Sequence, residues 1–350
     1  IGKAKFELAV DAEKFSFYDL APFVHSVSSM KGPLKTSIAV KGSLNELTVD
    51  DIKINFLNTQ LALKGNVKDI LNSDKMLISA AFYDSYIQPT DLPQFMESLQ
   101  IPGAKDLGVL NIDTLTYNGS PLNFRTKLLL VTEKKGSLAL DGSLNLQSSE
   151  MIYKADVKTS NFNISPFAGI ASSLNIKGSI EGKGTSPGKL NATVSIMGDG
   201  SDLNGYNLDT LRLNADARNG LIDYQFIAAS KTMGVDFAGD LNFTNQDNPA
   251  YELDGLIRNF NLSRFIDDST YNTDINLSVN ASGENFNPEL MNLYLTLTMY
   301  DSKIQGLAID STRAIVDLRK NDGGQRVINL ISDLADITLI GNFSMPQTAA

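Results

Sequence analysis

Apolar residues recur at every second position along most of this chain. In the run Leu138–Leu144, apolar residues and one glycine alternate with alanine, aspartate and serine. The same order of apolar, apolar, glycine, apolar at alternate positions occurs seven times, at Leu138/Leu140/Gly142/Leu144, Ile38/Val40/Gly42/Leu44, Leu61/Leu63/Gly65/Val67, Leu174/Ile176/Gly178/Ile180, Val235/Phe237/Gly239/Leu241, Tyr251/Leu253/Gly255/Ile257 and Ile337/Leu339/Gly341/Phe343. Because successive side chains of a strand point to opposite faces, the pattern predicts strands with one apolar face. Glycine on that face permits bending or close approach.

The alternation is interrupted four times by segments that contain prolines, aromatic residues or asparagines. These interruptions lie at residues 14–30, 86–103, 161–173 and 259–271, and the second has a helix-like spacing at Leu92, Phe95 and Leu99. Between them we predict about 20 strands, including strands at 4–10, 108–117, 121–131, 136–146 and 151–159. Short turns such as Asp199-Gly200 and Asn219-Gly220 favour antiparallel neighbours.

Two stretches of the chain repeat with the same order. The segment 161–165, Asn-Phe-Asn-Ile-Ser, matches 259–263 at an offset of 98, and residues 203–218 align without a gap with 304–319 at an offset of 101. Five identities fall in the second alignment: Gly205/Gly306, Asp209/Asp310, Arg212/Arg313, Asp216/Asp317 and Arg218/Arg319. The sequence therefore predicts an internal repeat. For the Asp209/Arg212 and Asp310/Arg313 pairs we expect ion pairs on the polar face.

We predict a mainly β fold, an elongated and repeated antiparallel sheet that curls into an open, taco-like groove with a few short helical interruptions. The prediction treats residues 1–350 as one continuous array with approximate units 4–82, 83–159, 160–257 and 258–350.

Composition removes several classes of function. Thirty Lys and Arg stand against 40 Asp and Glu, so the formal net charge is −10, which disfavours a nucleic-acid partner. The absence of cysteine removes disulfide frameworks and thiolate metal sites. The chain starts at Ile1 with no leader and has no apolar run of membrane-spanning length, so we interpret it as a piece of a longer protein.

The residues offer little to a catalytic mechanism. His25 is the single histidine, and we expect it to be structural. The glycine-rich run 179–189 lacks the strand-to-helix context of a phosphate loop, and the acidic turn around Asp199 and Asp202 lacks the ligand spacing of a calcium loop. We therefore predict no enzyme, no cofactor and no metal site.

The strands and interruptions together resemble the AsmA/TamB family, and within it the long TamB-type proteins. The resemblance rests on the LALKGNV, LALDGSL and LNIKGSI strands, on NFNISPF and NFNLSRF, and on NGYNLDTLRLNADARNGLIDYQF followed by VDFAGDLNF. It implies a periplasmic protein of a diderm bacterium, anchored at the inner membrane by a segment outside this chain. It also implies passage of phospholipids to the outer membrane, and a role in outer-membrane protein assembly with a barrel protein as partner.

The one-sided apolar character of the strands independently suggests a lipid-binding function. If the apolar faces of a repeated sheet do not close completely, they leave a lined channel, and acyl chains could fill it without directional polar partners. We predict that the lining comprises Leu128, Leu130, Leu138, Leu140, Val194, Ile196, Leu211, Leu213, Val235 and Phe237. The alternative for these residues is a dry packed core. Two other classes stay open, a structural or adhesive β-solenoid with a sealed interior and a polysaccharide-active β-helix enzyme.

Overall fold

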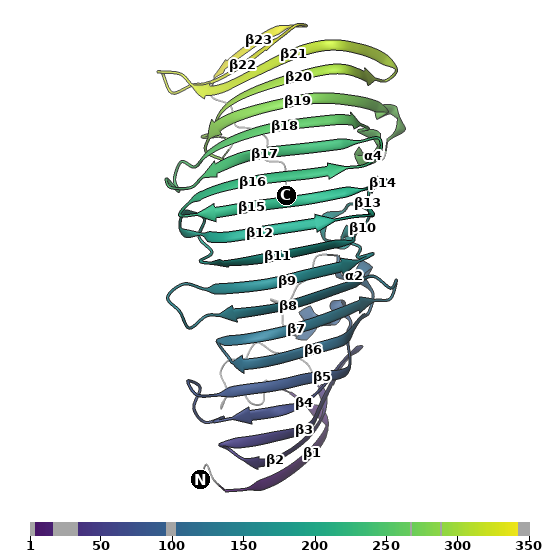
Figure 1. The fold of residues 1–350 in the computed structure, drawn as a ribbon, viewed down its shortest axis with the longest axis vertical. Coiled ribbons are helices and arrows are strands. Elements are labelled where there is room, and N and C mark those ends of the chain that lie inside the picture. The colour runs from purple at the N-terminus through teal and green to yellow at the C-terminus, as the bar shows by residue number, and fades with distance from the viewer. Residues whose placement is uncertain (1–3, 17–33, 96–102, 267, 288, 342–350) are drawn as a thin grey trace. The chain divides into compact units, whose positions relative to one another are not determined.

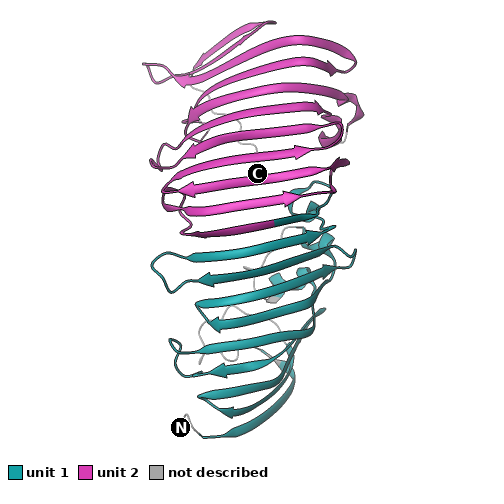
Figure 2. Cartoon of the chain, in the orientation of Figure 1, with its two compact units in different colours: residues 1–177 teal, residues 178–350 magenta. Residues whose placement is uncertain are grey.

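The computed structural model describes residues 4–16, 34–95, 103–266, 268–287 and 289–341. Twenty strands belong to one open antiparallel sheet, and the helices are few and at most four residues long in this part of the chain (Figure 1). The prediction of a mainly β, antiparallel fold with short helical interruptions is therefore confirmed. The chain divides into two compact units, unit 1 with residues 1–177 and unit 2 with residues 178–350 (Figure 2). The division into four repeat units, at residues 4–82, 83–159, 160–257 and 258–350, stays a prediction from the sequence.

Unit 1 is built around nine strands that pair in chain order. The strands are β1 (Phe6–Phe15), β2 (Leu34–Ser43), β3 (Glu46–Phe56), β4 (Thr59–Lys68), β5 (Leu77–Ile87), β6 (Leu110–Ser120), β7 (Asn123–Thr132), β8 (Ser137–Asn145) and β9 (Ile152–Ser160). The other elements among the described residues of unit 1 are η3 (Pro89–Asp91), α1 (Leu92–Phe95), α2 (Ala104–Leu107), α3 (Ser165–Ala168) and β10 (Ser172–Ser173). The segment with helix-like spacing does contain a helix, α1, which begins at Leu92. Leu99 and His25 lie outside the described residues.

Unit 2 contains a second series of antiparallel strands. β11 (Ile176–Lys183) contains the boundary between the units, and β12 (Asn191–Gly198) is followed by a separate hairpin of β13 (Ser201–Leu203) and β14 (Tyr206–Leu208). The main series continues with β15 (Thr210–Arg218), β16 (Leu221–Ala229), β17 (Gly234–Asn242), β18 (Ala250–Phe260), β19 (Thr273–Glu284), β20 (Asn292–Ile304), β21 (Leu307–Lys320), β22 (Arg326–Ser332) and β23 (Asp336–Gly341). The short helices are η4 (Pro187–Lys189), α4 (Ser263–Ile266) and η5 (Ser269–Tyr271).

Register places the alternating apolar residues on one face in each unit. Residues that lie directly opposite each other in an antiparallel pair share a face. In unit 1 one such row runs through Leu63, Phe82, Leu115, Leu128, Leu140 and Val157. In unit 2 another runs through Ile196, Leu213, Phe226, Phe237, Gly255, Val279 and Leu297. We call the face that carries these rows the apolar face of each unit, and the opposite one the polar face.

The long connections of each unit lie at the same ends of its strands. In unit 1 these are the connections after β5 and after β9, and in unit 2 they are the β13–β14 hairpin and the segment with α4 and η5 (Figure 1). We call this side the helical margin, and the opposite side, where only turns or η4 join the strands, the turn margin. Asn219-Gly220 is a two-residue turn at the turn margin, as predicted. Asp199-Gly200 is not a hairpin turn, because it leads from β12 into the separate hairpin.

β-Bulges near the helical margin bend the strands. The β4–β5 pairing shifts between Gln60 and Ala62, opposite Asp84, whose φ is +43°. The next residue, Ser85, is buried and its hydroxyl accepts a hydrogen bond from the backbone nitrogen of Ala62 at 2.9 Å. Asp301-Ser302 repeats this arrangement on β20, with a φ of +40° and a 2.8 Å bond from the Asn276 nitrogen. An extra residue in one strand increases the local bend and twist, so the hydroxyl restores the hydrogen bonding that the bulge interrupts.

Aromatic rings fill the space above the glycines of the apolar face in unit 2. Tyr224 lies opposite Gly239, Phe237 opposite Gly255, and Tyr251 opposite Gly283. A Cβ on Gly239 would lie 2.9 Å from the Tyr224 hydroxyl oxygen, and one on Gly283 would lie 2.7 Å from Cζ of Tyr251. Glycine therefore makes room on the apolar face for a ring from the neighbouring strand.

We expect Gly239→Ala to lower the free energy of unfolding by about 1–3 kcal/mol, because the added methyl group would overlap the carbonyl oxygen of Glu252 and the hydroxyl oxygen of Tyr224. Gly234→Ala on the same strand is the matched control, since no atom lies within 4 Å of a Cβ there. Its effect should stay within about 0.5 kcal/mol. Urea unfolding followed by circular dichroism measures both values, and equal losses would refute the steric explanation.

Candidate functional site

The apolar face is the candidate functional surface, and all ten residues predicted as lining lie on it. In unit 1, Leu128 lies opposite Leu140, and Leu130 lies opposite Leu138. In unit 2, the other six occupy the apolar face of β12, β15 and β17: Val194, Ile196, Leu211, Leu213, Val235 and Phe237. Each of the ten side chains is half-buried. Whether they contact a lipid stays a prediction.

Within the residues that the structure describes, the paired strand positions of the apolar face carry charged side chains only at Lys320 and Arg326, which lie opposite each other at the turn-margin ends of β21 and β22. The other exceptions to purely apolar chemistry include a few hydroxyl groups, for example those of Thr126 and Ser332. The backbone groups of these strands are used in the ladders. This surface therefore offers almost no hydrogen bonds to a ligand, and its chemistry matches hydrocarbon.

Part of the apolar face in unit 2 is covered by the β13–β14 hairpin. Tyr206 and Leu208 are buried there, and they pack with Ala228 and Met233. Leu211 and Val235, two of the predicted lining residues, pack against this cluster. The packed-core alternative therefore describes the row next to the helical margin better than it describes the rows farther from it.

The predicted lining omits three aromatic members of the candidate surface. Tyr224, Phe226 and Tyr251 lie on the apolar face beside the predicted Phe237, and burial raises the pKa of Tyr224 and of Tyr251. The repeated pattern places Tyr251 on that face without naming it as lining, and alternation in residues 222–226 could have placed the other two there. Their positions over glycines depend on the cross-strand register, which the sequence does not state.

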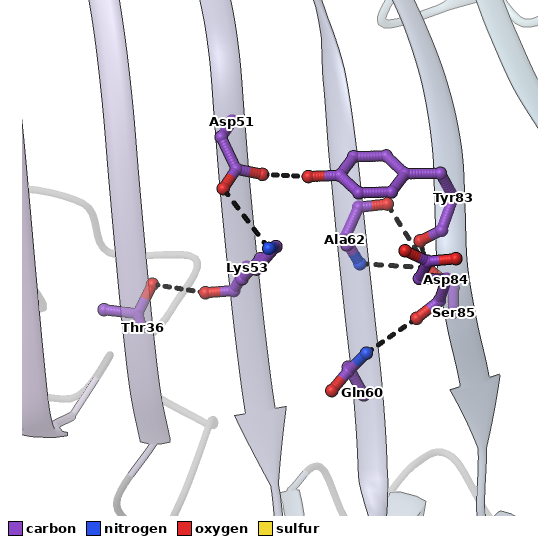
Figure 3. A network of polar contacts seen from close by, with 8 residues as sticks. All are labelled: Thr36, Asp51, Lys53, Gln60, Ala62, Tyr83, Asp84 and Ser85. Atoms are coloured by element: carbon purple, nitrogen blue, oxygen red, sulfur yellow. Dashed lines mark hydrogen bonds and ion pairs between the residues drawn. The ribbon is translucent and has the colours of Figure 1, made fainter.

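The polar face of unit 1 carries a network around Tyr83 (Figure 3). The Tyr83 side chain crosses β4, and its hydroxyl donates a hydrogen bond to Asp51 on β3. This bond, with burial and the charge of Asp51, raises the pKa of Tyr83 to about 12. The ammonium groups of Lys53 and Lys64 each lie 5.9 Å from the centre of the ring. These contacts tie three strands together near the β4–β5 bulge.

Ion pairs on the polar face join neighbouring strands or neighbouring positions of one strand. Arg125 binds Asp141 with two hydrogen bonds of 3.0 and 3.1 Å, and Lys127 lies 3.2 Å from the same carboxylate. The hydrogen bond from Arg125 is the main cause that lowers the pKa of Asp141. In the two repeats of unit 2, the ion pairs join Arg218 to Asp216 and Arg319 to Asp317, within the described residues. The arginines of both pairs are exposed, so these pairs stabilise the fold little.

A row of carboxylates crosses the polar face of unit 2. Asp216, Asp223, Asp240 and Glu252 lie opposite one another on β15 to β18, beside an open hollow of about 660 Å³. A hydrogen bond between Asp223 and Asp240 is the main cause that raises the pKa of Asp240, followed by burial. Hydrocarbon would not be bound by such a row, so this hollow is distinct in chemistry from the apolar face.

The other motifs considered in the sequence form no chemical site in the described residues. Residues 199–209 form a bend and the β13–β14 hairpin, and the glycine-rich run forms the end of β11 and a turn with η4. No group of three or more acidic or histidine side chains in the described ranges is placed to hold a metal ion.

Comparisons with protein-family models, curated proteins and solved structures find no match to this chain. In the described part of the chain, no helix has the length and apolar character needed to cross a membrane. The class of the protein is therefore defined by its own architecture: an open antiparallel sheet whose units each have one predominantly apolar face.

We expect Asp240→Asn to raise stability near neutral pH and to flatten its pH dependence. Because the folded pKa of Asp240 is raised, the wild type gains stability as the pH falls through that folded pKa and loses it as the pH rises. The amide removes the repulsion from Asp223 at pH 7, and with it the gain on acidification.

Thermal unfolding between pH 4 and pH 7.5 measures this change. Asp236→Asn is the control, because Asp236 is on the same strand but lies opposite Ile227 and Leu256. An identical pH profile for Asp240→Asn and the wild type would contradict the role of the carboxylate pair.

Proposed function

We propose that the apolar face of this chain binds the acyl chains of phospholipids. In this proposal the chain is a periplasmic part of a bridge-like lipid-transfer protein of AsmA/TamB type. The observation that supports the proposal is the combination of two properties on one face: apart from Lys320 and Arg326 it has no charged side chain at the described paired positions, and the ten side chains predicted as its lining stay half-exposed.

Exposed hydrocarbon is costly in water. Each Å² of apolar surface that leaves water contributes roughly 25 cal/mol, so an uncovered apolar face favours an apolar ligand. An acyl chain suits this face because it needs no directional polar partner. A peptide strand suits it less well, since its backbone groups would have no partners on a face whose own backbone groups pair within the sheet.

The apolar rows also cross the strands, and this direction matters for movement along the sheet. In unit 1 the row through Leu63, Phe82, Leu115, Leu128 and Leu140 passes from strand to strand, each residue opposite the next. A chain that slides along such a row exchanges one set of methyl contacts for an equivalent set. Each exchange is therefore nearly neutral in free energy, which is the property that a transfer path needs.

The cellular part of the proposal follows from the family resemblance. It places the chain in the envelope of a diderm bacterium, with an inner-membrane anchor outside this chain and an outer-membrane barrel protein as partner in assembly. The competing function is a structural or adhesive sheet without lipid cargo. The packing of Tyr206 and Leu208 on part of the apolar face in unit 2 favours that competitor at the helical margin.

Mass spectrometry of the purified, undenatured protein separates the two functions. The lipid-binding function predicts phospholipid that co-purifies, or that binds when vesicles or micelles are offered. A lipid-free protein that also rejects added phospholipid would support the structural function and overturn the proposal.

Leu140→Asp should reduce the bound phospholipid by about tenfold or more. A charged aspartate in hydrocarbon costs about 2.5–3.5 kcal/mol, and 1.4 kcal/mol corresponds to a factor of ten. Ala139→Asp is the matched control, because it adds the same group at the adjacent position of β8, on the face that carries Lys158. Circular dichroism shows whether both variants fold. Equal lipid binding by the two variants would refute the assignment of the apolar face as the binding surface.

A further inference from the structure

Unit 2 contains two hairpins with the same internal geometry. In β13–β14 the turn residues Asn204 and Gly205 have φ angles of +51° and +79°, and in β20–β21 Gln305 and Gly306 have +51° and +83°. The pairing agrees at the repeat offset of 101, since Leu203 pairs with Tyr206 and Ile304 pairs with Leu307. Residue by residue, the surfaces of the two hairpin tips are therefore comparable.

The first hairpin binds the second Asn-Phe-Asn segment of the chain. The Tyr206 ring stacks with Phe260 and Phe265 at centroid distances of 6.4 and 6.1 Å. Its hydroxyl accepts a 2.8 Å hydrogen bond from the backbone nitrogen of Asn261. The guanidinium of Arg264 lies 4.4 Å from the Tyr206 ring centre and donates to the carbonyl oxygen of Gly205. One segment thus covers the tip with aromatic, hydrogen-bonding and cationic contacts.

The corresponding surface of the second hairpin is bare. Leu307 takes the position of Tyr206, and its exposed fraction is 73%, compared with 5% for Tyr206. We call the surface formed by Gly306 and Leu307 the Leu307 surface.

The second hairpin tip is nevertheless held in place on its other side. The backbone nitrogen of Gln305 donates to the carbonyl oxygen of Asn272 at 3.2 Å, and its side chain donates to that of Thr270 at 3.2 Å. The carbonyl of Gly306 lies at the position where Gly205 accepts a hydrogen bond from Arg264. The Leu307 surface is therefore formed before any partner arrives, which lowers the entropic cost of binding.

We propose that the Leu307 surface is a docking site for a segment of the type of residues 259–266, an extended Asn-Phe-Asn stretch that leads into one helical turn with an arginine and a further phenylalanine. The partner is a repeat of the same kind as those within this chain. Its phenylalanines cover Leu307, and its arginine donates to the carbonyl oxygen of Gly306. The proposal is independent of the proposed lipid-binding function.

A fluorescent peptide of residues 258–272, titrated with the whole chain and followed by anisotropy, tests this docking. The chain's own copy of the segment already covers Tyr206, so we expect one site for the added peptide. Leu307→Asp should weaken binding at least about tenfold, because it places a charge under the phenylalanines. Leu307→Tyr should strengthen binding, because the new hydroxyl can accept the hydrogen bond that Tyr206 accepts from Asn261.

The matched control is the same peptide with Phe260→Ser and Phe265→Ser, which should not bind. Leu307 is exposed, so both protein variants should keep the thermal unfolding temperature of the wild type. The proposal is overturned if the peptide binds neither the wild type nor Leu307→Tyr, or if Leu307→Asp leaves binding unchanged. Self-association of the chain that Leu307→Asp abolishes, without peptide binding, would show a second copy as the occupant and would also overturn it.

Discussion

Cross-strand register is the constraint on which the rest of this structure depends. The side-chain period of a strand is two, so a slip of one residue between neighbours would move an entire apolar set to the polar face. Three kinds of contact oppose such a slip: aromatic rings seated over glycines, such as Phe237 over Gly255; serine hydroxyls at bulges, such as Ser85; and charge pairs across strands, such as Arg125 with Asp141. Each of them fits one register only.

The two faces of the sheet differ in how far their side chains are paired or covered by other parts of the chain. On the polar face, charged and hydroxyl groups are paired with one another in ion pairs and in the Tyr83 network. Among the described residues, the apolar face is covered only in part: in unit 2 the β13–β14 hairpin covers the row through Leu211, Ala228 and Val235, next to the helical margin, and in unit 1 Val40, Leu47 and Val49 are buried. The proposed lipid function follows from the remainder, because hydrocarbon that a protein leaves half-exposed favours an apolar ligand.

The repeated segments have the same local geometry but different surroundings. Asn161 and Asn259 both adopt positive φ angles, of +47° and +50°, and their backbone nitrogens both donate to an asparagine side chain. Local sequence fixes this geometry in each copy. What then packs against a copy depends on its neighbours, as the buried Tyr206 and the exposed Leu307 demonstrate.

The sequence by itself determined the mainly β class, the antiparallel pairing, the positions of several strands and the face on which Leu128, Leu140 and the other eight predicted residues lie. These properties are local, because alternation and short turns are written in consecutive residues. The helix-like spacing of apolar residues in the second interruption also identified the helix that begins at Leu92.

Only the tertiary structure decided which residues face one another across strands. It placed Tyr224 and Tyr251 over glycines, and it put Asp223 beside Asp240. It also turned Asp199-Gly200 from an expected hairpin turn into the start of a separate hairpin that covers Leu211 and Val235. The physical reason is that each of these outcomes depends on contacts between residues far apart in the chain, whose free energies no local pattern contains.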